Sequence, residues 1–159
     1  DNIDANLTLQ VSASKIKFSL GKINLISKVI DGKFPDYQKV VPKENTKTLT
    51  VTSSDFINSV ERVASVSIDR KEGVKLELSR DKLKLSVNST NSGDGNEIVA
   101  AKYDGDDLVI GFNSKYLIDI ASEIEDKDLT FNLKDSTSPV LVLDNSDKNS
   151  FYVIMPMKI

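Results

Sequence analysis

The sequence contains no cysteine, no histidine and no tryptophan. Without cysteine there can be no disulfide framework, no thiolate metal site and no cysteine nucleophile. Without histidine the chain lacks the commonest general base, the Ser–His pair and nearly every zinc-binding pattern. The glycine-rich phosphate loops and the nucleophile elbow of serine hydrolases are also missing from the sequence. We therefore expect no catalytic residues, no metal site and no cofactor.

The sequence also lacks a large excess of one charge sign and any long apolar run. The 159 residues carry 24 acidic and 21 basic side chains, which gives a formal net charge of -3. Such a balance provides no global basic field, so any contact with nucleic acid must be local or geometric. No apolar run approaches the length of a membrane span, and a chain without cysteine suits a reducing compartment. With 39% apolar residues, the chain is expected to fold.

The first 43 residues have two parts. Apolar residues alternate with polar ones from Leu7 to Leu25, with breaks near "SAS" and "GK". This alternation predicts three antiparallel strands, each with one buried face. The following stretch, "VIDGKFPDYQKVVPKENTK", contains Gly32, Pro35 and Pro42 and is typical of a connector between domains. An ordinary long loop is the alternative.

Two later stretches resemble each other. "LTVTSSDFINSVERVASV" and "LVIGFNSKYLIDIASEI" each join a short strand to an amphipathic helix. A shift of 60 residues places Phe56 on Tyr116 and Val60 on Ile120, and Ser53 or Ser54 is available to cap the first helix. Three alternating segments follow each helix. We predict an α+β fold made of two strand-helix-three-strand repeats; a chance similarity of two common helices is the alternative.

The acidic residues do not form a recognisable catalytic pattern. Glu61, Asp119 and Glu123 fall on the predicted helix faces opposite the apolar positions. We interpret them as solvated side chains, because a catalytic carboxylate pair needs a shared cleft and a raised pKa. A carboxylate-dependent hydrolase therefore remains only a distant alternative.

The C-terminal stretch "FYVIMPMKI" is unusually apolar for a chain end. Its alternation is typical of a last strand that completes a sheet, and Pro156 would end that strand. Methionine adapts its shape to varied partners, so Met155 and Met157 also suit a binding surface. Both interpretations can hold together, with one face in the core and the end open as a groove.

Four stretches resemble the bacterial sliding clamp family, the beta subunit of DNA polymerase III: "SKVIDGKFPDYQKVVP", "GFNSKYLID", "DSTSPV" and "YVIMPMKI". The resemblance covers essentially the whole chain. It implies a DNA-clamp domain in which two helices pack on antiparallel sheets. It also implies that residues 1–43 are the last strands of a middle domain plus an interdomain linker, and that residues 44–159 are the C-terminal domain.

The resemblance further implies a cytoplasmic, non-enzymatic processivity factor. In the family a ring homodimer encircles double-stranded DNA, with helices lining the hole. The polar faces of the helices expected at 53–67 and 114–125, with Arg62 and Lys115, would then face DNA, and Val66 would lie at the ring interface. We expect no membrane association, and we expect this fragment to be monomeric or to associate through its uncovered strands.

Family members bind short motifs of the polymerase III catalytic subunit, the clamp loader and other clamp-binding proteins in an apolar pocket. By resemblance that pocket would be lined by Pro35, Lys39, Val40, Asn113, Tyr116, Thr137, Val153, Met155, Pro156 and Met157. Lys39 stands where many relatives carry Arg, and Thr137 stands where an aliphatic residue is common. The middle-domain wall of the pocket is expected to be absent from this chain. The alternative is a stand-alone structural or interaction β-rich domain with no role in replication.

Overall fold

The computed structural model describes residues 6–66, 73–89 and 93–159. The chain divides into two compact units, Asp1–Asp36 and Tyr37–Ile159. In the first unit, β1 (Leu7–Val11), β2 (Lys15–Leu20) and β3 (Ile23–Lys28) form an antiparallel sheet in the order β1-β2-β3. The three predicted strands are therefore confirmed.

The prediction that each of these strands has one buried face is wrong. The apolar side chains of Val11 and Ile23 are 72% and 69% exposed. The physical reason is that, among the described residues of this unit, no helix or second sheet packs on the three strands. Alternation marks which side chains share a face, but that face is buried only where another layer covers it.

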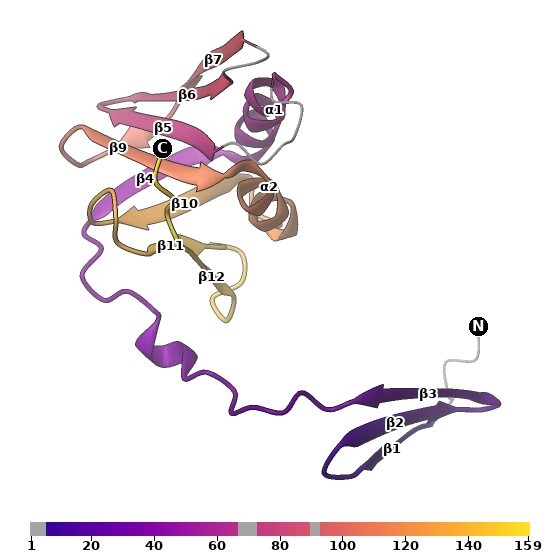
Figure 1. Cartoon of the computed structure of the whole chain (residues 1–159). Coiled ribbons are helices and arrows are strands. Elements are labelled where there is room, and N and C mark those ends of the chain that lie inside the picture. The colour runs from indigo at the N-terminus through magenta and orange to yellow at the C-terminus, as the bar shows by residue number, and fades with distance from the viewer. Residues whose placement is uncertain (1–5, 67–72, 90–92) are drawn as a thin grey trace. The chain divides into compact units, whose positions relative to one another are not determined.

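The second unit contains both predicted repeats (Figure 1). It begins with a short 3₁₀ helix, η1 (Tyr37–Lys39), and each repeat then follows the predicted order of strand, helix and three strands. The elements are β4 (Lys47–Thr52), α1 (Ser53–Ala64), β5 (Gly73–Ser79), β6 (Lys82–Ser89), β7 (Gly93–Ala100), β8 (Lys102–Tyr103), β9 (Leu108–Asn113), α2 (Ser114–Glu123), β10 (Asp128–Leu133), β11 (Val140–Leu143) and β12 (Phe151–Ile154). The two-residue strand β8 is an addition that the sequence did not indicate.

The two repeats exchange their first strands. One sheet has the order β12-β11-β10-β4-β8 and the other has the order β7-β6-β5-β9. Strand β4 thus leaves its own repeat and pairs antiparallel with β10, while β9 pairs antiparallel with β5. Because each sheet contains strands from both repeats, neither repeat can complete its sheet alone.

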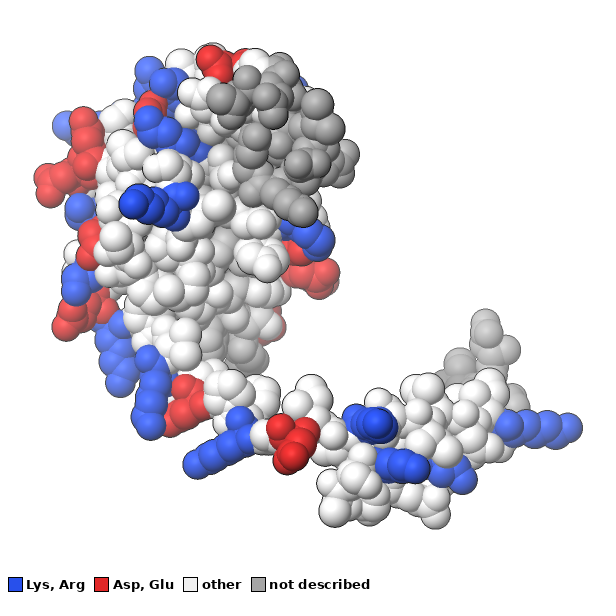
Figure 2. Space-filling model, in the orientation of Figure 1, with Lys and Arg blue, Asp and Glu red and all other residues white. Residues whose placement is uncertain are grey.

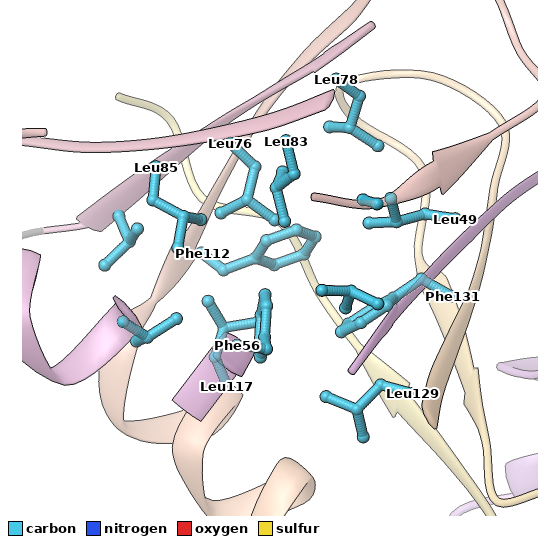
Figure 3. Packing of buried hydrophobic residues seen from close by; sticks show 14 of the residues in the cluster. Leu49, Phe56, Leu76, Leu78, Leu83, Leu85, Phe112, Leu117, Leu129 and Phe131 are labelled. Atoms are coloured by element: carbon cyan, nitrogen blue, oxygen red, sulfur yellow. The ribbon is translucent and has the colours of Figure 1, made fainter. Parts of the chain in front are cut away.

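The two helices contact each other and share one core with both sheets. Every second residue of β5 is buried, which places Val74, Leu76 and Leu78 on the core face. Figure 3 shows Phe112 between leucines of the second sheet and Phe56 of α1. The Phe56 ring lies 5.4 Å from that of Phe131, centroid to centroid, in a tilted arrangement. This core explains why a chain without disulfides can hold two sheets together.

The structure corrects the offset between the repeats. Helix α1 begins at Ser53 and α2 at Ser114, so equivalent positions are one residue further apart than the shift of 60 that we predicted. Phe56, which is fully buried, therefore corresponds to buried Leu117 rather than to Tyr116. The side chain of Tyr116 is 58% exposed. A large exposed aromatic residue is thus free for another role.

The helix ends also differ from the prediction. Thr52 is the N-cap of α1 without a side-chain hydrogen bond, whereas Ser53 Oγ donates to the carbonyl of Ala121. Helix α1 ends at Ala64, and residue 67, where we had expected its end, lies outside the described residues. Helix α2 ends at Glu123 because Ile124 turns to extended backbone and enters the core. Across the described ranges, no helix is long and apolar enough to cross a membrane.

Candidate functional site

The last five residues, 155–159, which we call the tail, run from one sheet to the other. They leave the edge strand β12 after Ile154, and the backbone N–H of Met157 donates to the carbonyl of Gly111 at 2.8 Å. Gly111 lies in β9, which is the edge strand of the other sheet, and the two residues form an antiparallel bridge. Figure 1 shows the tail in yellow as it passes from β12 toward β9. The tail therefore connects the edges of the two sheets.

Two glycines lie directly against the tail. A Cβ atom on Gly73 would lie 2.8 Å from Met157 Sδ, and one on Gly111 would lie 2.9 Å from the carbonyl oxygen of Met157. Both distances are shorter than a normal carbon contact. Sequence analysis missed these residues. A glycine inside a strand is a general sign of close backbone approach, but it does not say which segment approaches.

Asn113 and Tyr116 lie where β9 passes into α2. The side chain of Asn113 caps the helix by accepting from the backbone N–H of Lys115 at 2.9 Å, and Tyr116 is exposed on the first turn. Since Met157 pairs antiparallel with Gly111, the tail residues before Met157 run toward this end of β9. The register therefore brings Met155 and Pro156 to the start of α2.

Thr137 lies in a tight loop, residues 135–138, at the start of β11. The carboxylate of Asp135 accepts from the backbone N–H groups of Thr137 and Ser138 at 2.9 and 2.8 Å and from both hydroxyls at 2.9 Å. These bonds, the Thr137 N–H above all, lower the pKa of Asp135. Because Val140 pairs with Ile154, the loop lies at the end of β12 from which the tail departs. Asp135 positions Thr137, and sequence analysis missed it, although "DSTS" is a typical Asp-turn sequence.

Seven of the predicted site residues thus come from segments that converge at the tail, and we call them the tail surface. They are Asn113, Tyr116, Thr137, Val153, Met155, Pro156 and Met157. Met155 is 59% exposed and Met157 36% exposed, while Ile154, the last residue of β12, is buried in the core. Strand β12 therefore completes its sheet and at the same time carries an exposed apolar end. Such a surface can bury an apolar side chain of a partner.

The three remaining pocket residues belong to the connector. Pro35 lies in the first unit, whereas the tail surface belongs to the second. Lys39 ends η1, and the backbone N–H of Val40 donates to the carbonyl of Tyr37 at 2.9 Å. Both side chains are exposed. Their participation in the site stays a prediction.

Each of the two cations predicted to face DNA is bound by a carboxylate. Arg62 forms an ion pair with Glu97 of β7, with Nε donating to Oε2 at 2.9 Å, and its Nη2 donates to Ser59 Oγ at 3.1 Å. The hydrogen bond to Glu97 raises the pKa of Arg62, and the same bond lowers the pKa of Glu97. Lys115 Nζ lies 2.5 Å from Asp119 Oδ2 one turn along α2. The helix surfaces consequently offer little uncompensated positive charge.

Val66, the predicted ring-interface residue, lies just after α1 and is half-buried. A Cβ atom on Gly95 of β7 would lie 2.8 Å from Val66 Cγ2. Glycine at this position lets the end of α1 approach β7, which is the edge strand of its sheet. The structure places Val66 beside the edge strand of that sheet, and its role in a ring stays a prediction.

The fold is shared with solved structures of sliding clamps. The clamp of Bartonella birtlesii, solved bound to griselimycin, superposes with a TM-score of 0.88 at 42% identity, over 96% of this chain and 41% of that one. The architecture of two helices on antiparallel sheets is therefore that of a sliding-clamp domain, which confirms the predicted fold class.

The sequence comparison identifies the family. Residues 38–158 match the family described as DNA polymerase III beta subunit, C-terminal domain. The beta sliding clamp of Caulobacter vibrioides is 40% identical over 95% of this chain, and that of Escherichia coli K12 is 31% identical over 100%. The chain spans 41% and 43% of these two relatives. The chain belongs to the DNA polymerase III beta subunit family, so a stand-alone β-rich domain with no role in replication is not favoured.

Proposed function

We propose that this chain is the C-terminal part of a sliding clamp and that it docks partner proteins through the tail surface. Residues 1–43 are then the last strands of a middle domain plus the interdomain linker, and residues 44–159 are the C-terminal domain. In its full-length form the protein is a ring homodimer that encircles double-stranded DNA as a non-catalytic processivity factor in the cytoplasm. Family membership and the coverage of 41% to 43% of the relatives support this division.

The observation that carries the docking proposal is the exposed apolar tail surface. Its segment from Met155 to Met157 is held on one side by the pairing of β12 with β11 and on the other by the bridge of Met157 to Gly111. Partners would be the polymerase III catalytic subunit, the clamp loader and other proteins with a clamp-binding motif. A Leu or Phe side chain that is buried there gains about 1.5–3 kcal/mol. A short peptide must also be ordered as it binds, so its net affinity stays modest and its exchange fast. Fast exchange is what a shared docking site requires.

The paired charges of α1 and α2 support encirclement rather than tight DNA binding. A protein that holds duplex DNA by phosphate contacts needs free Lys and Arg side chains, and its affinity then falls steeply with salt. Here Arg62 and Lys115 each face a carboxylate. Figure 2 likewise shows positive and negative side chains interspersed on the visible face of the second unit. A closed ring could slide over DNA with such weak contacts.

A peptide titration tests the docking proposal. The probe is a fluorescently labelled peptide copied from the clamp-binding motif of the polymerase III catalytic subunit. We expect Met155→Ala to weaken binding on the order of tenfold, as for truncation of an apolar anchor. Phe151→Ala is the matched control, because Phe151 is 43% exposed at the opposite end of β12. Absent binding to the folded chain, or equal affinities for the Met155 variant and the wild type, would refute docking at this surface.

A further inference from the structure

We propose that Gly73 and Gly111 are positioning residues that form a seat for the tail and thereby fix the apolar wall made by Met155, Pro156 and Met157. This inference rests on the proposed docking function. It adds two residues that do not themselves contact a partner but determine the position of the docking surface.

Both glycines lie on the outward face of the second sheet. Leu108, Ile110 and Phe112 of β9 point into the core, so Gly111 belongs to the alternate, outward row. In β5 the core face begins at Val74, so Gly73 is also outward. Gly111 is nevertheless buried, whereas its outward neighbour Val109 is 46% exposed. What covers Gly111 is the tail.

The glycines leave the space that the tail side chains occupy. The Sδ atom of Met157 would lie 2.8 Å from a Cβ on Gly73, and the Cγ2 atom of Ile159 would lie 3.0 Å from it. At Gly111 a Cβ would meet the Met157 carbonyl oxygen at 2.9 Å and would come closer still to Ile159 Cγ2. A methyl group at Gly73 meets only flexible side-chain ends, but one at Gly111 also meets backbone. Alanine at Gly111 therefore forces the tail backbone to move.

The seat determines the position of Met155 because the segment between the two held residues, Ile154 and Met157, is so short. Pairing of β12 with β11 holds Ile154, and the bridge to Gly111 holds Met157. Only Met155 and Pro156 lie between these two points, and the proline ring restricts its own φ. A shift of Met157 is consequently transmitted to Met155 over two residues.

The tail, rather than the sheet, will yield to an added methyl group. Gly111 belongs to a strand that is paired with β5 over six residue pairs and carries three core side chains. The tail beyond Pro156 borders an open cavity of about 730 Å³, lined in part by Met157, Lys158 and Ile159. It therefore has room to move without opening the core.

The experiment compares Gly111→Ala with the wild-type chain. The chain contains two methionines, Met155 and Met157, so methyl NMR of ¹³C-labelled methionine gives two signals, both from the tail. We expect both signals to shift and the Met157 amide to exchange at least about tenfold faster, since its bond to Gly111 is weakened. The labelled clamp-binding peptide should bind on the order of tenfold more weakly. Gly32→Ala is the matched control, because a Cβ there meets nothing within 4 Å.

A rescue separates positioning from a general loss of stability. Gly111→Ala combined with Ile159→Ala removes the nearest side-chain atoms and should restore part of the peptide affinity and of the amide protection. Gly73→Ala should give smaller shifts in the same direction, and it decides the question if Gly111→Ala does not fold. The seat is overturned if the methyl signals and the Met157 amide are unchanged in Gly111→Ala, or in Gly73→Ala where that variant has to decide. Shifted signals with unchanged peptide affinity would instead reject the docking role of the wall while the seat stands.

Discussion

The backbone N–H of Met157 bonds to the carbonyl of Gly111 at 2.8 Å, and this bond joins the end of the chain to the edge of the opposite sheet. An open edge strand is a template for unwanted pairing with other chains. The tail covers part of the edge of β9 while its own Met155 stays exposed. One segment therefore protects the fold and presents the candidate docking surface.

The corrected offset between the repeats makes a stability prediction. Phe56→Ala should lower the free energy of unfolding by about 3–5 kcal/mol, because it empties a fully buried site against Phe131. Tyr116→Ala should change it by less than about 1 kcal/mol, since that side chain is 58% exposed. Urea denaturation followed by circular dichroism measures both. Similar losses for the two variants would mean that the two positions are equivalent after all.

The sequence predicted the order of elements well because hydrophobic periodicity is a local property. The predicted alignment of the two repeats matched Phe56 with Tyr116. A one-residue error of this kind is hard to see in the sequence, because two amphipathic helices still look similar after such a shift until the buried face of each is known. The exchange of β4 and β9 between sheets depends on pairing between distant residues, such as Leu49 with Phe131, which no local pattern encodes. Resemblance to a family suggested the residues of the tail surface, whereas Gly73, Gly111 and Asp135, which hold them, were found only in the structure.

The acid stability of the second sheet should depend on Glu77. Hydrogen bonds from Lys75 and Lys84, at 2.5 and 2.8 Å, lower the pKa of Glu77 to about 2. A carboxylate with a lowered pKa stabilises the fold above the pKa of the unfolded chain, about 4.3, and this stability is lost as the pH falls toward 2. Glu77→Gln should therefore remove part of the pH dependence of stability between about pH 4.5 and 2.

All three of these side chains are partly exposed, so the effect should stay below about 1 kcal/mol. Thermal unfolding of both proteins in a pH series measures it, and at pH 7 the variant should be slightly the less stable. Parallel curves for Glu77→Gln and the wild type throughout that window would show that the ion pairs contribute nothing in solution.

The loop that carries Thr137 should depend on Asp135. Asp135→Ala removes the acceptor for the N–H groups of Thr137 and Ser138, so their amides should exchange faster by about tenfold or more. If Thr137 takes part in docking, the affinity for the clamp-binding peptide should fall as well. Asp147→Ala is the matched control, since Asp147 holds a similar turn with Asn149 and Ser150 beyond the far end of β12.

The Asp147 variant should loosen its own turn and leave peptide affinity unchanged. Equal affinities for the Asp135 and Asp147 variants would remove Thr137 from the docking site. Unchanged exchange at Thr137 would show that the loop is held by its backbone alone.

Removal of residues 1–36 should leave the second unit folded. Among the described residues, the members of the hydrophobic core lie between Leu49 and Ile154, and none of them belongs to the first unit. The melting temperature of the shortened chain should stay within about 4 °C of that of the full chain, which corresponds to a change in stability of less than about 1 kcal/mol.

The tendency of the shortened chain to self-associate should fall, because exposed apolar residues such as Val11 and Ile23 are removed with the open strands. Calorimetry and sedimentation velocity measure the two effects, and Phe56→Ala in the shortened chain should still lower the melting temperature. A shortened chain that unfolds without a cooperative transition would show instead that the strands at 7–28 are part of the folding unit.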